Sequence, residues 1–223
     1  MSVVGNLVGV GVIDKYVYAI GGIHHTGIGN LQMFHGCCEV YDTSTNEWSF
    51  IARMPTPRFA VGVAVLNGEL YAVGGQKSST SALKTVERYS PDQNRWSSVA
   101  PMSAHRSQPG TAVLDGKLYV VGGDACCLNH ALKSAEYYDV QTDRWTSLPD
   151  MNTPRSGAGV VAHDGKLYVV GGKSDDMMQP LSSIEVYNPK SNTWSYLPSE
   201  MSEAKHSFGV ALINKPGLSY HQR

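Results

Sequence analysis

Four basic residues recur at nearly equal spacing, each four residues after a methionine. They are Arg58, Arg106, Arg155 and Lys205. A planar guanidinium group donates two parallel hydrogen bonds to one carboxylate, so a cluster of such groups suits recognition of an acidic peptide. A second interpretation stays open, because a residue repeated in every unit of a chain is often structural. In that interpretation each basic side chain holds its own loop in place.

A histidine-rich segment contains His24, His25 and His35 and is followed by Cys37. Imidazole and thiolate groups are the ligands that zinc prefers, but this spacing matches no standard zinc site. Residues 23–36 also contain no Asp or Glu. We therefore predict no bound metal and no cofactor.

The four cysteines form two adjacent pairs, Cys37–Cys38 and Cys126–Cys127. Adjacent pairs do not make the spaced disulfide framework of a small secreted protein. This pattern favours a reducing compartment, and we expect a cytoplasmic location. Cys38 occupies a repeat position that is otherwise apolar, which predicts a buried and unreactive thiol.

The composition excludes two classes of partner. The 18 Lys and Arg residues are balanced by 19 Asp and Glu residues, giving a formal net charge of −1. Nucleic-acid binding requires a one-sided basic surface, so it is not expected. No apolar stretch approaches the ~20 residues of a membrane-spanning helix, so membrane binding is not expected either.

A repeat of about 49 residues organises the whole chain. The four tryptophans lie 48, 49 and 49 residues apart, a tyrosine lies seven residues before each, and each unit contains a double glycine. The tryptophans are Trp48, Trp96, Trp145 and Trp194, and the tyrosines are Tyr41, Tyr89, Tyr138 and Tyr187. The double glycines are Gly21 and Gly22, Gly74 and Gly75, Gly122 and Gly123, and Gly171 and Gly172. We interpret all of these as structural residues of a repeat fold.

Each unit has the pattern of four antiparallel strands. Apolar residues alternate with a period of two, and Asn67–Gly68, Asp115–Gly116 and Asp164–Gly165 separate the first strand from the second. Such dipeptides favour tight hairpin turns. Four short strands per unit of this length are typical of one blade of a β-propeller. We therefore predict an all-β propeller of four blades plus one extra strand, with glycine where the backbones approach closely and aromatic rings between blades.

The repeat resembles the kelch repeat in its double glycine, its Tyr–Trp spacing and its junctions MPTPR and MNTPR. The resemblance extends from residue 1 to about residue 213. Within that family, the stretches GVGVID, ERYSPDQNRW and MNTPRSGAGV are most similar to BTB-kelch adaptors. The resemblance implies a non-enzymatic protein-interaction module that recognises substrates for a cullin-type ubiquitin ligase.

Antiparallel topology places the junctions between blades and the loops after the double glycines at the same end of the propeller. The resemblance implies that partners bind at this end. The expected partner-binding residues are Arg58, Arg106, Ser107, Arg155, Ser156, Lys205, His206, His24, His25, Asp124, His130, Asp175 and Asp176. The three aspartates partly cancel the positive charge, which weakens the case for a purely acidic ligand.

We predict one domain over residues 1–223. Blade 1 covers about 5–53, blade 2 about 58–101, blade 3 about 106–150 and blade 4 about 155–200, followed by a partial fifth strand at 206–213 and an irregular tail at 214–223. Family propellers usually have six blades, so we expect an incompletely closed or truncated propeller. The sequence contains no BTB segment, so we expect no direct cullin binding.

Two other functions stay open. Many kelch proteins bind actin, so a cytoskeletal scaffold is the main alternative. Kelch-type enzymes, such as copper oxidases and sugar epimerases, are a less favoured alternative. Copper chemistry of that kind needs converging Tyr and His ligands, and few tyrosines here lie outside the repeat positions.

Overall fold

The computed structural model describes residues 6–25, 32–34, 36–78, 80–125, 130–174 and 179–212, with the backbone alone at residues 24–25 and 32–34. Over these ranges the chain forms strands and turns only. None of the described segments is a helix long and apolar enough to cross a membrane. Four antiparallel sheets of four strands each follow one another along the chain, which confirms the all-β propeller prediction.

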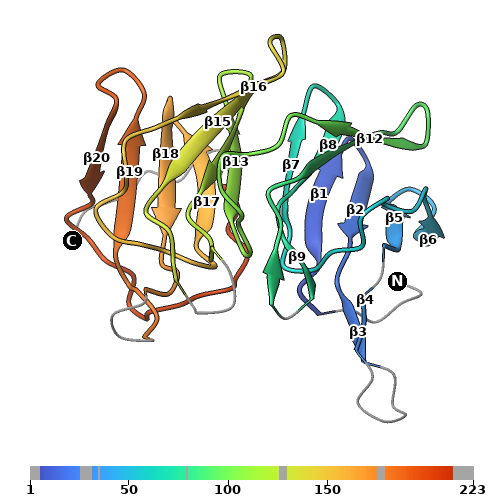
Figure 1. Ribbon diagram of the computed structural model, residues 1–223, viewed down its shortest axis with the longest axis horizontal. Coiled ribbons are helices and arrows are strands. Elements are labelled where there is room, and N and C mark those ends of the chain that lie inside the picture. The colour runs from blue at the N-terminus through green and yellow to red at the C-terminus, as the bar shows by residue number, and fades with distance from the viewer. Residues whose placement is uncertain are drawn as a thin grey trace.

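The four sheets are four blades, arranged from blade 1 on the right of Figure 1 to blade 4 on the left. Blade 1 contains β1 (Gly9–Ile13), β2 (Tyr16–Ile20), β5 (Cys38–Asp42) and β6 (Glu47–Phe50). Blade 2 contains β7 (Gly62–Leu66), β8 (Glu69–Val73), β11 (Val86–Ser90) and β12 (Arg95–Val99). Blade 3 contains β13 (Gly110–Leu114), β14 (Lys117–Val121), β15 (Ala135–Asp139) and β16 (Arg144–Ser147). Blade 4 contains β17 (Gly159–His163), β18 (Lys166–Val170), β19 (Ile184–Asn188) and β20 (Thr193–Tyr196).

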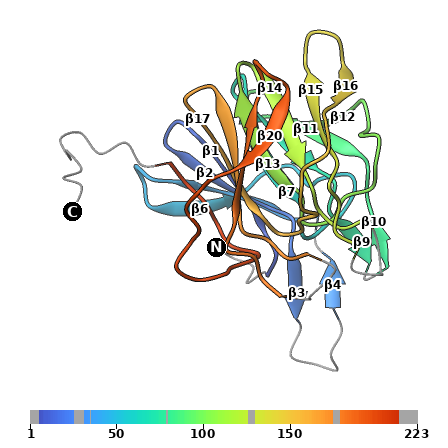
Figure 2. The same cartoon turned by 90° about the vertical axis from the view of Figure 1, so that its left-hand side faces the viewer.

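Two small strand pairs extend the connections between the second and third strands of blades 1 and 2. They are β3 (Ile23–His25) with β4 (Gln32–Phe34), and β9 (Gln76–Ser78) with β10 (Ser81–Ala82). Both pairs lie at the lower end of the molecule in Figures 1 and 2. The loops that follow the double glycines of blades 1 and 2 therefore lie at the same end of the fold.

The hairpin turns take the conformation that their sequences predict. Asn67 and Gly68 have φ values of 54° and 75°, and Asp115 and Gly116 have 49° and 69°. Positive φ at both positions gives a turn whose twist matches that of the flanking strands, and Asn, Asp and Gly accept this conformation at low cost. These turns fix the register in which the first two strands of a blade pair.

The first strands of successive blades lie side by side around the hub of the propeller, β1 next to β7, β7 next to β13, and β13 next to β17. Their contact depends on glycine. A Cβ atom placed on Gly110 would lie 2.3 Å from Cγ2 of Val160, and one placed on Gly159 would lie 2.1 Å from Cγ2 of Val210. Any larger residue at these positions would push neighbouring blades apart.

A chain of backbone hydrogen bonds also joins the blades at the hub. Ala60 N–H donates to the Leu7 carbonyl at 3.0 Å, Gln108 to Ala60 at 2.9 Å, Gly157 to Gln108 at 3.1 Å, and Ser207 to Gly157 at 2.8 Å. Residues 207–212 thus follow the course of a first strand, although they pair with no strand among the described residues. No comparable contact joins β17 back to β1 in this part of the chain, so the described blades form an open arc.

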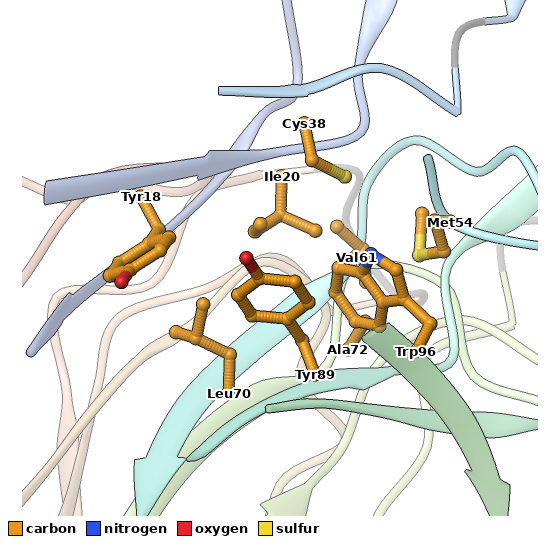
Figure 3. Close-up of a cluster of buried hydrophobic side chains, with 9 residues drawn as sticks. All are labelled: Tyr18, Ile20, Cys38, Met54, Val61, Leu70, Ala72, Tyr89 and Trp96. Carbon is orange, nitrogen blue, oxygen red and sulfur yellow. The ribbon is translucent and has the colours of Figure 1, made fainter. Parts of the chain in front are cut away.

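Aromatic rings fill the space between blades, as the repeat predicts. Figure 3 shows the cluster between blades 1 and 2, in which Tyr18 of blade 1 faces Tyr89 of blade 2 and Trp96 lies on the far side of Tyr89. The ring centroids of Tyr18 and Tyr89 are 6.0 Å apart. Tyr71 with Tyr138 at 6.0 Å, and Tyr119 with Tyr187 at 6.4 Å, repeat this contact at the next two boundaries. Within each blade the Tyr–Trp pair lies across two adjacent strands, with centroids 5.0–5.2 Å apart.

Candidate interaction face

One end of the arc carries both the junctions between blades and the loops that follow the double glycines, and we call it the junction face. Isolated β-bridges join the two kinds of segment there. Phe59 pairs with Gln76, Ser107 with Asp124, and Ser156 with Lys173. The structure thus confirms that junctions and loops share one end.

The double glycines allow each junction to cross the second strand of the blade before it. The Gly75 N–H donates to the Arg106 carbonyl at 2.8 Å, and a Cβ atom on Gly74 would lie 2.3 Å from that oxygen. Gly122 and Gly123 stand in the same relation to the Arg155 carbonyl, at 2.2 Å and 2.8 Å. Because backbone passes so close to backbone, these positions require glycine.

The junction arginines point into the protein. The Arg106 Nη1 donates to the carbonyls of Gly122 at 2.8 Å and Ser134 at 2.9 Å, and its Nη2 lies 3.1 Å from the Glu136 carboxylate. Glu136 also accepts hydrogen bonds from the backbone N–H and the hydroxyl of Ser103. The guanidinium group therefore links its own junction to the second and third strands of the next blade.

Arg58 and Arg155 repeat this arrangement with Glu87 and Glu185. All three arginines are 0–1% exposed. Burial lowers the pKa of the Arg58 and Arg106 guanidinium groups, and the paired glutamates oppose that change.

The prediction that Arg58, Arg106 and Arg155 contact a partner is therefore wrong. Their guanidinium groups are buried, and carbonyl and carboxylate oxygens inside the fold accept their hydrogen bonds. A ligand could reach them only if the junctions opened. The alternative interpretation, in which each arginine holds its loop, agrees with the structure.

Ser107, Ser156 and Asp124 also lie beneath the surface, at 0%, 2% and 8% exposure. The Ser156 hydroxyl donates to Oδ2 of Asp124 at 2.6 Å, across the boundary between blades 3 and 4. Their prediction as surface contacts is wrong for the same reason of burial. Asp124 instead ties the loop of blade 3 to the next junction.

The remaining predicted residues divide into two groups. Lys205, His206 and His130 are exposed on the junction face, so contact with a partner stays a prediction for them. Lys205 lies 3.4 Å from Glu203 and does not enter a following blade as the arginines do. The side chains of His24 and His25 and all of Asp175 and Asp176 lie outside the described residues.

Three exposed lysines on this face are not among the residues predicted from the sequence. Lys77 lies in β9, Lys84 accepts a hydrogen bond from Met102 N–H through its carbonyl, and Lys133 does the same for Met151. Lys84 and Lys133 occupy the same repeat position, but Gly36 and Ser182 stand there in the other two blades, so the pattern is incomplete. Their position directly before the third strand of blades 2 and 3 is the signal that could have found Lys84 and Lys133.

The described residues contain no cluster of three or more His, Cys, Asp or Glu side chains able to hold a metal ion. Cys38 is fully buried, and burial raises the pKa of its thiol to about 11. The expectation of a buried thiol at Cys38 is confirmed.

Comparison with protein families and structures places this geometry among known proteins. The KLHDC2/KLHL20/DRC7 Kelch-repeats domain matches residues 8–215. The solved structure of YjhT superposes on this chain with a TM-score of 0.80. The match covers 92% of this chain and 73% of the YjhT chain at 14% sequence identity, so it shows a likeness of fold.

Curated relatives match over shorter segments. Kelch-like ECH-associated protein 1A of Danio rerio is 41% identical over 72 residues, which are 32% of this chain and 12% of the relative. Kelch-like protein 28 of Homo sapiens is 40% identical over 70 residues, or 30% of this chain and 12% of the relative. The Influenza virus NS1A-binding protein homolog of Mus musculus is 49% identical over 45 residues, 20% of this chain and 7% of the relative. The matched segments thus span about an eighth or less of these relatives.

Proposed function

Because the chain belongs to the kelch-repeat family, we propose that its junction face recognises a peptide segment of a partner protein without catalysing a reaction on it. We further propose that it is the substrate-recognition part of a ubiquitin-ligase adaptor. The resemblance to BTB-kelch adaptors and the kelch-like relatives support this role.

The observation that carries the proposal is the contrast between the repeated buried contacts of the junctions and the variable loops above them. Buried Arg–Glu pairs recur in blades 2, 3 and 4, and double glycines that touch backbone recur in all four blades. The loops above these contacts differ in length and residue type between blades. Variable loops on a rigid scaffold are where binding proteins carry their specificity.

Exposed lysines in the loops of blades 2 and 3 support an acidic peptide. The ammonium groups of Lys77, Lys84 and Lys133 belong to these loops and are exposed, whereas Asp124 is buried. We propose that these lysines take the role predicted above for the arginines. Exposed ion pairs are individually weak, so several must act together to hold a ligand.

The test is binding to an array of synthetic peptides that scan acidic sequences, followed by calorimetry on the strongest. The double variant Lys84→Gln/Lys133→Gln should weaken binding roughly threefold to tenfold, the loss of two exposed charge contacts. The matched control is Lys166→Gln/Lys190→Gln, which removes the same charge near the turns at the opposite end of blade 4. Equal affinity of both variants, or no array binding, would contradict peptide recognition at the junction face.

The adaptor role needs a separate measurement. The chain fused to a BTB segment should promote ubiquitination of the protein from which the bound peptide derives, and Lys84→Gln/Lys133→Gln should reduce it. Co-sedimentation with actin filaments tests the cytoskeletal alternative. Binding to filaments without peptide binding would favour the scaffold over the adaptor.

A further inference from the structure

Each boundary between blades is built by the same contacts, and these have two distinct halves. The later blade contributes a branched side chain from its first strand, and the earlier blade contributes a glycine. Val63 of blade 2 packs on Gly9 of blade 1, where an added Cβ would lie 2.3 Å from Cγ2 of the valine. Val160 and Gly110 repeat the contact between blades 3 and 4.

The polar part of the boundary is equally regular. The Trp96 indole Nε1–H of blade 2 donates to the Ala52 carbonyl at 2.9 Å, and the Ala52 N–H donates to Oδ1 of Asn94 at 2.8 Å. The later blade therefore binds both backbone groups of one residue that follows the earlier blade. Trp145 and Asp143 bind Ala100 in the same way, at 2.8 Å and 2.9 Å.

Blade 1 carries the later-blade half of this interface, and no other blade among the described residues packs against that side of it. Val10 and Val12, at the positions of Val63 and Val65, are 59% and 56% exposed. Trp48 and Asn46 occupy the positions of Trp96 and Asn94. Among the described residues neither meets the backbone of another blade, and Asn46 accepts a hydrogen bond only from Tyr41. We call this surface the blade 1 flank.

The other end of the arc carries the first-strand part of the earlier-blade half. Gly209 occupies the position of Gly159, but no atom lies within 4 Å of a Cβ placed on it. Ala211, the next residue on the same side of the segment, is small and exposed. We call residues 207–211 the C-terminal edge.

The two ends also match in backbone hydrogen bonding. In the chain of hydrogen bonds at the hub, each later residue donates its N–H to the carbonyl of the one before. Within the described residues, the Leu7 N–H at one end and the Ser207 carbonyl at the other have no backbone partner. A donor is thus left on the blade 1 flank and an acceptor on the C-terminal edge.

We propose that the blade 1 flank of one copy of this chain binds the C-terminal edge of a second copy. Val10 and Val12 of one copy would pack on Gly209 and Ala211 of the other, in the register used three times inside the chain. The described residues carry the first-strand contacts of both halves, Val10 and Val12 at one end and Gly209 and Ala211 at the other, which is why a second copy is the occupant. Self-association does not depend on the proposed peptide binding.

The interface is heterologous, since it joins two different surfaces. Such contacts add copies head to tail, into a ring if the geometry closes and into an open chain if it does not. The protein should therefore form dimers and larger species as its concentration rises. Sedimentation velocity and light scattering measure this distribution directly.

Two variants each remove one half of the interface. Val10→Lys/Val12→Lys places ammonium groups on the blade 1 flank, where exposed side chains tolerate them, and should weaken association at least ~10-fold because a charge would have to be buried. Gly209→Val occupies the space that Val10 would enter, and the open surroundings of Gly209 accept the new side chain within one copy. Circular dichroism and thermal unfolding verify that both variants are folded.

Mixing the two variants is the decisive step. Each variant alone should stay monomeric, because neither can supply both halves of a contact. The mixture should form a one-to-one dimer and nothing larger, because the intact C-terminal edge of the first variant binds the intact blade 1 flank of the second. A wild-type chain that stays monomeric at every concentration would overturn the proposal. So would variants that still self-associate, or a mixture that does not pair.

Discussion

The Nε atom of Arg155 lies 3.1 Å from a carboxylate oxygen of Glu185, and both side chains are fully buried. The arginine belongs to the junction before blade 4, and the glutamate belongs to the third strand of that blade. Arg58 with Glu87 and Arg106 with Glu136 stand in the same relation. A buried ion pair of this kind fixes the position of a junction, because separating the two charges leaves one of them unpaired in the interior.

Replacing one partner of a buried pair should therefore destabilise the protein strongly. In Arg106→Met, Glu136 loses its cation and the Gly122 carbonyl loses a donor. The free energy of unfolding should fall by about 3–5 kcal/mol, measured by urea denaturation.

The matched control for this variant is Lys205→Met, at the equivalent position after Met201. The Lys205 side chain is 54% exposed, so its removal should change the free energy of unfolding by less than about 0.5 kcal/mol. Similar small effects of the two substitutions would show that the buried pair does not hold the junction.

A comparison of Gly122 with Gly116 separates two reasons for requiring glycine: close contact with neighbouring backbone, and a positive φ. Both have positive φ, at 61° and 69°, but a Cβ on Gly122 meets the Arg155 carbonyl and one on Gly116 meets nothing within 4 Å. Gly116→Ala should cost about 1–2 kcal/mol, the price of the left-handed conformation alone. Gly122→Ala should cost about 1–3 kcal/mol more, because the junction must shift. Equal melting temperatures for the two variants would contradict this.

Buried tyrosine hydroxyls and the buried Cys38 thiol lead us to expect a loss of stability at alkaline pH. Burial raises the pKa of Tyr89 and of Tyr119 to about 12, from an ordinary value of 10.0, and that of Cys38 to about 11, from 9.0. The folded state thus keeps protons that the unfolded state releases. The stability contributed by these groups is complete below about pH 9 and declines as the pH rises through the folded pKa values.

The corresponding measurement is the free energy of unfolding in urea from about pH 8 to about pH 11, where it should decrease steadily. Cys38→Ala removes one titrating group and should make the decrease shallower. A free energy of unfolding that stays constant over this range would show that these groups ionise as freely in the fold as out of it.

The fold could be predicted from the sequence because its signals repeat. The double glycines, the Tyr–Trp pairs and the Asn–Gly or Asp–Gly turns each recur at the same positions, and each has a direct steric or packing cause. Repetition gave several independent indications of one blade.

The site was harder to predict for the same reason. Regular spacing of Arg58, Arg106 and Arg155 was compatible with a surface cluster and with a buried frame, and only the burial of their partners distinguishes the two. Glu87, Glu136 and Glu185 recur two residues before the tyrosines, and they are the acidic partners that could have indicated burial. Lys84 and Lys133 share one repeat position, but Gly36 and Ser182 stand there in blades 1 and 4, so their periodic signal is weaker than that of the arginines.

The indole hydrogen bonds between blades give a last prediction, with its control inside the chain. Trp145→Phe keeps an aromatic ring but removes the Nε1–H that donates to the Ala100 carbonyl at 2.8 Å. The free energy of unfolding should fall by about 1–3 kcal/mol, because a partly buried carbonyl loses its donor. Trp48→Phe removes the same group at a place where the described residues offer no acceptor. It should therefore lower the free energy of unfolding of the monomer by about 1 kcal/mol less than Trp145→Phe does. If the two substitutions destabilise the monomer equally, the hydrogen bond between blades contributes nothing to stability.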